Sequence, residues 1–100
     1  MVERYAVTLN SPMGPRQGML ELVFGPSGIT GNLHLLGFDN PVSGRQTDDG
    51  CVRLRHCLRS LISELRCVTD LKLAQGQLSG TSRADQCSIL WSGTRTEPLP

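Results

Sequence analysis

The sequence repeats itself at an offset of 49 residues, and this feature constrains the fold most strongly. Three patterns recur without a gap: Leu22-x-Phe24 with Leu71-x-Leu73, Ile29-Thr30-Gly31 with Leu78-Ser79-Gly80, and Val42-Ser43-Gly44 with Trp91-Ser92-Gly93. Matches at one constant offset indicate a duplicated structural unit. We therefore expect a single domain over 1–100, built from half-repeats 1–49 and 50–98.

Within each half, apolar and polar residues alternate in short runs. A period of two places alternate side chains on one face of a β-strand. The clearest run is 51–59, where Val52, Leu54 and His56 share one face and arginines occupy the other. The runs predict eight strands, at about 3–10, 18–24, 29–36, 42–47, 51–59, 66–74, 78–84 and 87–95.

Glycine, proline and Asp-Gly pairs separate these runs. Asp49-Gly50 is a strong hairpin signal. We assign 37–41 to a turn because a proline follows Asn40, which makes the fourth strand short. The alternative for 52–66 is one amphipathic helix. The strand is favoured because the alternation persists and because the repeat aligns this segment with the first strand.

Eight short antiparallel strands must hide their unpaired edges, and closure into a barrel removes the edges. We predict an all-β, eight-stranded antiparallel up-and-down barrel; the alternative is a β-sandwich. Inward Gly31, Gly44, Gly80 and Gly93 fit either tight coiling of the barrel or β-bulges. The interior of such a barrel is filled by side chains or holds one small ligand, and the alternation is the same for both.

Three segments carry a resemblance: 9–15, Ile29-Thr30-Gly31 and 91–95. They resemble short uncharacterised bacterial barrel-like proteins and, more distantly, lipocalin or calycin barrels. Calycins usually carry Gly-x-Trp on the first strand and an arginine on the last. This chain has Arg95 on the last strand but no tryptophan on the first. The resemblance therefore implies a calycin-like barrel without a named class of ligand.

The predicted inner face is aliphatic apart from a few polar residues, among them Gln46. The candidates for ligand contact are Tyr5, His56, Thr69, Ser82, Trp91 and Arg95. We expect Arg95 to pair with a ligand carboxylate and His56 to lie opposite Thr69. Because a buried imidazole needs a partner, a core histidine bonded to Thr69 or to a backbone carbonyl is the alternative.

The predicted outer face of strands four to six is basic. Its cations are Arg45, Arg53, Arg55, Arg59, Arg66 and Lys72. The predicted pairs are Arg45 with Arg53, Arg53 with Lys72, Arg59 with Arg66, and Arg55 with Asp70. Opposed like charges are unfavourable, so this face is either an anion or partner site or a solvated face that prevents edge aggregation. It has no aromatic residues for base stacking, so nucleic acid is not expected.

Composition and motifs exclude other classes. The net charge of +1 gives no general attraction to nucleic acid or anionic membranes. The first residues are charged, and no run of about eighteen apolar residues occurs, so we expect a cytoplasmic protein with its four cysteines reduced. No triad elbow, phosphate loop or inward carboxylate pair is present, and no histidine pair suits a metal. We expect no catalytic residue, cofactor or metal.

We therefore expect a non-enzymatic barrel that binds a small apolar or amphipathic ligand in its interior. The alternative is an interaction or structural module that acts through the basic outer face as a homodimer. Outward apolar residues would then form the dimer contact; they are Val23, Leu36, Val68 and Leu90.

Overall fold

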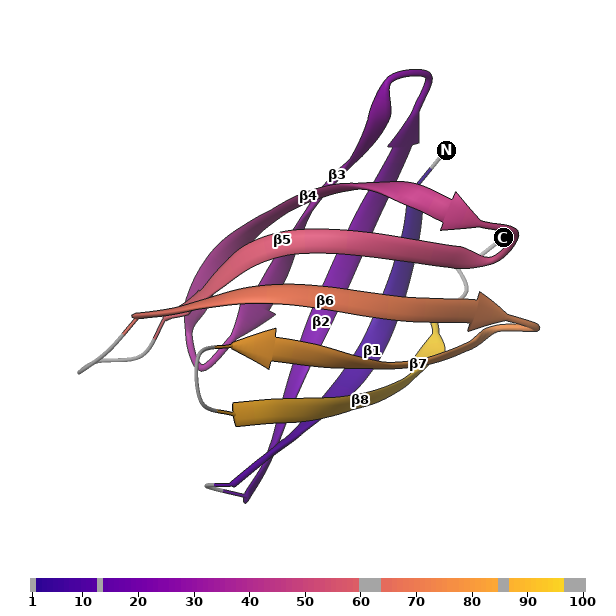
Figure 1. The fold of residues 1–100 in the computed structure, drawn as a ribbon. Coiled ribbons are helices and arrows are strands. Elements are labelled where there is room, and N and C mark those ends of the chain that lie inside the picture. The colour runs from indigo at the N-terminus through magenta and orange to yellow at the C-terminus, as the bar shows by residue number, and fades with distance from the viewer. Residues whose placement is uncertain (1, 13, 60–63, 85–86, 97–100) are drawn as a thin grey trace.

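A computed structural model of the chain describes residues 2–12, 14–59, 64–84 and 87–96. The eight strands are β1 (Val2–Ser11), β2 (Gly14–Gly25), β3 (Gly28–Leu35), β4 (Phe38–Asp48), β5 (Cys51–Arg59), β6 (Glu64–Ala74), β7 (Gln77–Ala84) and β8 (Cys87–Arg95). Each strand pairs antiparallel with the next, and β8 pairs with β1. The sheet is thus a closed up-and-down barrel, as predicted, and not a sandwich (Figure 1).

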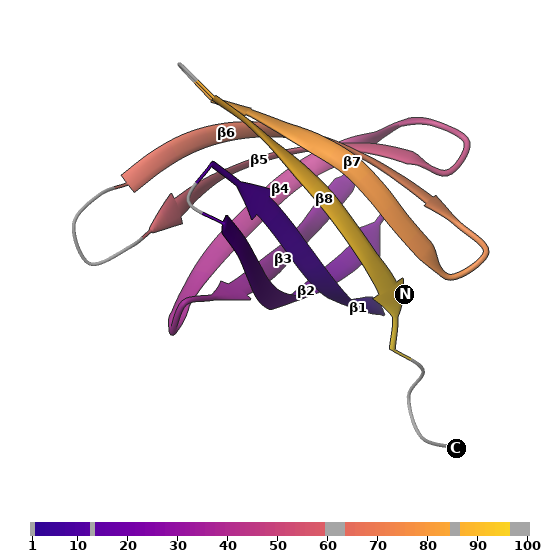
Figure 2. The same ribbon diagram turned by 90° about the horizontal axis from the view of Figure 1, so that it is seen from below.

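The barrel is flattened, with extents of 38 × 27 × 20 Å. Strands β1 to β3 form one side and cross β5 to β8 on the other side at a steep angle (Figure 1). Seen from below, the end of β8 lies beside the start of β1 (Figure 2). There the Thr96 amide donates a hydrogen bond to the Arg4 carbonyl (2.8 Å). Within the described ranges, no helix is long and apolar enough to cross a lipid bilayer.

The bounds of β5 and β8 match the prediction, and the helix predicted as an alternative over 52–66 does not form over 52–59 or 64–66. Residues 60–63 lie outside the described residues. The prediction for 37–41 was wrong. The turn consists of Leu36 and Gly37 alone, both at positive φ (56° and 79°), as a type I′ hairpin requires.

Strand β4 therefore starts at Phe38, and the Asn-Pro pair lies inside it. The side chain of Asn40 is wholly buried. Its Nδ2 donates to the Leu33 carbonyl (3.0 Å), and its Oδ1 accepts from the Arg59 amide (3.0 Å). These bonds let a turn-forming residue tie β4 to β3 and β5, while Pro41 stays on the exposed side.

The offset of 49 residues recurs in the strand register. Leu20 pairs with Leu33, and Thr69 pairs with Ser82 at the equivalent place. The β1–β2 and β5–β6 hairpins agree in the same way, as do β3–β4 and β7–β8. The junctions between the halves differ: Val42 pairs with His56, whereas Trp91, which is equivalent to Val42, pairs with Leu9 instead of Val7. The closing junction is shifted by two residues.

At the inward glycines the backbone of the neighbouring strand occupies the space that a Cβ would need. A Cβ on Gly44 would lie 1.8 Å from the Arg53 carbonyl oxygen, and one on Gly31 would lie 1.9 Å from that of Glu21. The register runs unbroken through both glycines. They therefore serve tight coiling and are not bulges; the register shift in β4–β5 falls between Gln46 and Asp48.

Among the described residues, one cluster of buried side chains fills the middle of the barrel. Its centre is made of fully buried leucines: Leu20, Leu22, Leu33, Leu54 and Leu71. Burying one such side chain contributes about 1.5–3 kcal/mol. The interior between the two ends of the barrel is therefore packed with side chains.

Candidate functional site

One end of the barrel contains a solvent-open cavity of about 420 Å³, which we call the mouth. The β4–β5 and β6–β7 turns and the ends of β1 and β8 surround it. Its lining residues are Glu3, Tyr5, Phe24, Gln46, Gly50, Val52, Leu73, Ala74, Gln75, Gly76 and Arg95. The mouth thus combines polar side chains from several strands with apolar ones.

Arg95 is the cation of this site. It pairs with Tyr5 across the β1–β8 junction, and its backbone amide donates to the Gly76 carbonyl (2.8 Å). Its Nε is buried and has no hydrogen-bond partner among the described residues. A buried N–H without an acceptor costs about 1–3 kcal/mol. An anion in the mouth would supply the missing acceptor.

Tyr5 and Glu3 form the second polar element. The Tyr5 hydroxyl donates to Glu3 Oε1 at 2.6 Å, although the ring is almost completely buried. Burial raises the pKa of Tyr5, and the hydrogen bond and charge of Glu3 raise it further, while Arg95 opposes them. The phenol therefore remains a protonated donor. Glu3 was not among the residues predicted for the site, although it lies two residues before Tyr5 on the same face of β1.

The remaining side chains of the mouth are amides and apolar groups. Gln46 was predicted to lie inside; it is exposed and forms part of the wall, because it lies at the end of the regular β4–β5 pairing. The floor consists of Val52, which is buried, and of Phe24 and Leu73, which are half-buried and pack on the core.

The other four candidates for ligand contact lie together inside the barrel, away from the mouth lining. His56 Nε2 is 2.6 Å from Thr69 Oγ1, Thr69 Oγ1 is 2.5 Å from Ser82 Oγ, and Trp91 Nε1 is 2.7 Å from Ser82 Oγ. The rings of His56 and Trp91 meet edge to face, with centroids 5.8 Å apart. We call these four residues the interior network.

The interior network has one direction that uses every hydroxyl hydrogen. The indole of Trp91 can only donate, so Ser82 accepts from it. Ser82 then donates to Thr69, and Thr69 donates to His56 Nε2. In this direction His56 is a neutral imidazole with its hydrogen on Nδ1, an atom without a partner among the described residues. Burial lowers the pKa of His56 to about 4, which agrees with the neutral form.

The predicted pairing of His56 was wrong by two residues. His56 pairs with Cys67, and Leu54 pairs with Thr69. A shift of two keeps every side chain on its face, so the hydrogen bond from Thr69 to His56 runs diagonally between strands.

The same shift changes the basic outer face. Arg45 does lie opposite Arg53. The other predicted pairs were wrong: Arg53 faces Asp70, Arg55 faces Val68, Arg59 faces Glu64, and Lys72 faces Cys51. Arg66 faces Cys57. Fewer like charges are therefore opposed than the sequence predicted. Arg83 on β7, which that prediction left out, joins this face.

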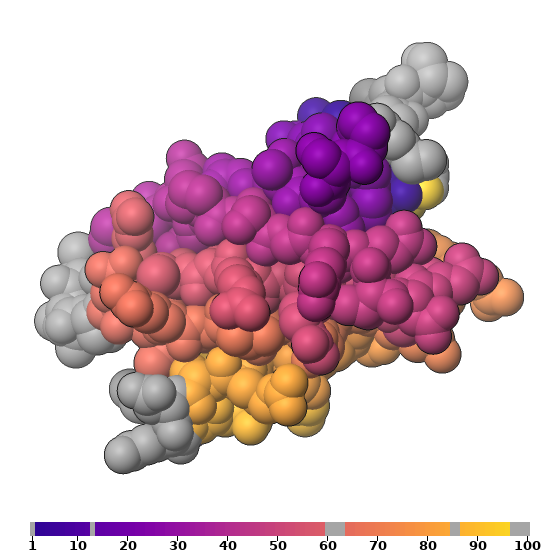
Figure 3. Space-filling model, turned by 45° about the horizontal axis from the view of Figure 1, so that its top comes forward, coloured from indigo at the N-terminus to yellow at the C-terminus, as the bar shows by residue number. Residues whose placement is uncertain are grey.

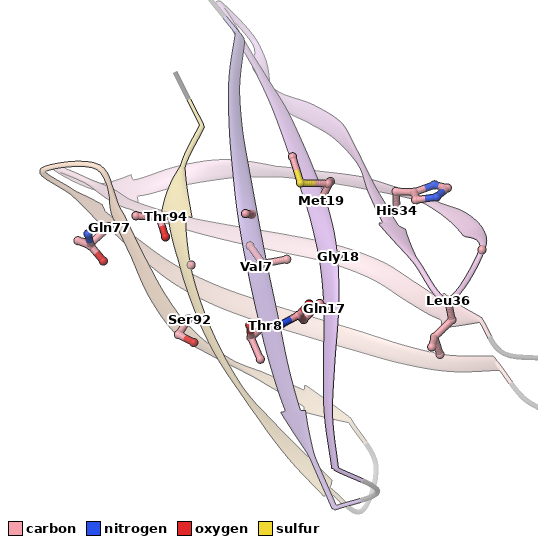
Figure 4. Close-up of a pocket in the computed structure, with 13 residues that line it drawn as sticks. Val7, Thr8, Gln17, Gly18, Met19, His34, Leu36, Gln77, Ser92 and Thr94 are labelled. Atoms are coloured by element: carbon pink, nitrogen blue, oxygen red, sulfur yellow. The ribbon is translucent and has the colours of Figure 1, made fainter. Parts of the chain in front are cut away.

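A larger hollow of about 840 Å³ lies on the outside of the barrel, over β8, β1, β2 and β3 (Figure 4). Its labelled side chains are mostly short or uncharged, such as Thr8, Gln17, Met19 and Ser92. His34 at its edge already bonds Asp39 (Nδ1 to Oδ1, 2.7 Å). The hollow therefore offers no converging charged groups, and the mouth is the stronger candidate for a binding site.

Exposed apolar residues are spread over the outer surface. Val23 lies opposite Val2, Leu36 is in the β3–β4 turn, and Leu90 is on β8. Val68 is only half-exposed and sits among arginines. The predicted homodimer contact stays a prediction.

The four cysteines are free thiols. Cys67 is buried, and burial raises the pKa of its thiol to about 11. Among the described residues, no group of three or more His, Cys, Asp or Glu side chains is arranged to hold a metal ion.

The chain matches no known protein-family model and no curated protein sequence. The architecture is compatible with a calycin-like fold, while membership of that family and a bacterial origin stay predictions.

Proposed function

We propose that the protein is a small binding barrel that takes the carboxylate of a small amphipathic molecule at its mouth. The observation that carries the proposal is the buried Nε of Arg95, which lacks an acceptor among the described residues at the edge of a cavity. A guanidinium binds a carboxylate through two parallel N–H···O bonds, which are among the strongest in proteins. The residues therefore favour a carboxylate over a neutral ligand.

The shape of the site limits the ligand. Its polar end would meet Arg95 and Gln46, and its apolar end would rest on Phe24, Val52 and Leu73. Because the leucine core below is packed, a long chain has nowhere to go. We therefore infer a short aliphatic or aromatic carboxylate held at the end of the barrel, and not a molecule threaded through it. The interior network supports the site as part of the packed core and does not touch the ligand.

Binding is favoured over catalysis. The hydroxyl in the lining of the mouth is that of Tyr5, whose pKa is raised and whose hydrogen is already donated to Glu3. Such a phenol is a poor nucleophile and a poor base.

Calorimetric titration of the full chain with acetate, hexanoate, decanoate and benzoate tests the proposal. We expect saturable binding that strengthens from acetate to hexanoate and then levels off. Arg95→Gln should weaken hexanoate binding about tenfold or more. Arg4→Gln is the matched control, because Arg4 lies next to Tyr5 but faces outward and pairs with Glu21 (2.7 Å). An affinity unchanged in Arg95→Gln, or no saturable binding of any acid, would refute the proposal.

A further inference from the structure

Four arginines from three neighbouring strands line a further cavity, of about 520 Å³, on the outside of the barrel. They are Arg53 and Arg55 on β5, Arg66 on β6 and Arg83 on β7; Val68 on β6 and Ala84 at the end of β7 complete the lining. The successive segments of β4 to β7 lie side by side on this face (Figure 3). None of these residues lines the mouth, so the inference is independent of the carboxylate site.

The strand register puts Val68 at the centre of this cluster. Arg55 and Arg83 flank it on the adjacent strands, in one cross-strand row. Arg66 and Asp70 flank it along β6, two residues away on the same face. Strand spacing places the Cα atoms of Arg55 and Arg83 roughly 10 Å apart. Arginine side chains are long enough to bring their guanidinium groups together over Val68.

Asp70 compensates only part of this charge. It accepts from Arg53 Nε (2.8 Å) and from Arg83 (Nη2, 3.1 Å). Arg55 and Arg66 have no partner among the described residues. The charge is local: residues 50–100 hold seven of the ten Lys and Arg residues of a chain whose net charge is only +1. An isolated cluster of this kind favours a compact, doubly charged anion.

We propose that this cluster binds the phosphate group of a phosphate monoester. A phosphate monoester carries close to two charges at pH 7 and presents three terminal oxygens, which match guanidinium groups arriving from three sides. A carboxylate offers one charge and two oxygens. Val68 supplies the apolar surface on which the organic part of the ester rests. Because the arginines are exposed, we expect a dissociation constant on the order of 1 mM.

A ¹H–¹⁵N NMR titration of the full chain with phenyl phosphate at pH 7.5 tests this site, read at the amides of Val68 and Ala84. We expect saturable shifts of both signals. Arg55→Gln and Arg66→Gln should each weaken binding about fivefold, and neither should unfold the barrel, because both side chains are exposed and unpaired among the described residues. Arg16→Gln removes an exposed arginine on β2 and is the matched control.

Phenyl sulfate, a monoanion of similar shape, should bind at least about fivefold more weakly. Equal binding of phenyl sulfate, shifts that do not saturate, or an equal loss in Arg16→Gln would overturn the proposal in favour of general charge attraction. Sedimentation with phosphatidylcholine vesicles containing phosphatidic acid distinguishes a lipid headgroup from a free ester. Binding to those vesicles without saturable phenyl phosphate shifts would also overturn it, because the face would then recognise a charged surface and not one group.

Discussion

Thr69 and Ser82 lie directly opposite each other on β6 and β7, and their hydroxyls are hydrogen bonded at 2.5 Å in the fully buried interior. Their equivalents in the first half, Leu20 and Leu33, pair in the same register and are also fully buried. One backbone geometry thus accommodates an apolar pair in one half and a polar pair in the other. The polar pair is tolerated because the interior network satisfies both hydroxyls.

Replacing Ser82 by alanine should destabilise the barrel by about 1–3 kcal/mol. The substitution removes the acceptor of the Trp91 indole and the donor to Thr69 together. Urea unfolding followed by Trp91 fluorescence, from the single tryptophan of the chain, measures the loss. Ser79→Ala on the same strand is the control, because Ser79 is exposed and should change stability by less than about 0.5 kcal/mol. Equal losses would show that the interior network contributes nothing.

Protonation of His56 should destabilise the fold at acid pH. A histidine in the unfolded chain titrates near pH 6.5, whereas burial lowers the native pKa of His56 to about 4. Between these values His56 is protonated in the unfolded chain and neutral in the native state. The free energy of unfolding is therefore highest above pH 6.5 and declines as the pH falls toward 4. The decline should reach about 3 kcal/mol.

Unfolding curves between pH 4 and pH 7.5 measure this decline, with His56→Gln as the comparison. The variant has no imidazole at position 56, so its stability should depend less on pH across the same window. His34→Gln is the control, because His34 is exposed on β3. A pH profile of His56→Gln that parallels the unmodified protein would contradict the assignment.

The fold could be predicted because apolar and polar residues alternate visibly within short segments of the sequence. In addition, eight antiparallel strands have few arrangements that pair all of their edges. The strand register could not, since a shift of two residues leaves every apolar side chain on the inner face. That ambiguity misplaced the partners of Arg53, Arg55 and Arg59. The start of β4 was predicted too late in the chain because an Asn-Pro pair usually favours a turn. Here the buried side chain of Asn40 instead bonds to β3 and β5, so the strand continues through the pair.

The candidate site was predicted in part. Tyr5 and Arg95 were both expected inside, but their meeting at the mouth depends on the β1–β8 junction. That junction departs by two residues from the repeat, and no local pattern in the sequence encodes the departure. The residues of the interior network were predicted to contact a ligand. The sequence pattern indicates which side chains face inward, but it does not indicate which of them form hydrogen bonds with one another.

Replacing Gly44 by alanine should prevent folding or cost about 3 kcal/mol or more. The new Cβ would stand 1.8 Å from the Arg53 carbonyl oxygen and 2.9 Å from the Cα of Leu54, so β4 and β5 would have to separate. Circular dichroism and thermal unfolding measure the effect. Gly25→Ala is the matched control, because its Cβ would meet nothing closer than 3.5 Å. A Gly44→Ala protein as stable as Gly25→Ala would show that the strands do not approach as described.

Cys67 should be the slowest cysteine to alkylate in the native protein. Burial raises the pKa of its thiol to about 11, so at pH 8 almost none of the reactive thiolate is present, and the barrel wall shields the sulfur. Iodoacetamide labelling followed by peptide mass spectrometry compares it with Cys51, Cys57 and Cys87, which are partly exposed. In urea the four rates should converge, since the protection comes from the fold and not from the local sequence. If Cys67 in the native protein were labelled as fast as Cys57, β6 would have to open readily. That result would contradict a packed interior around Cys67.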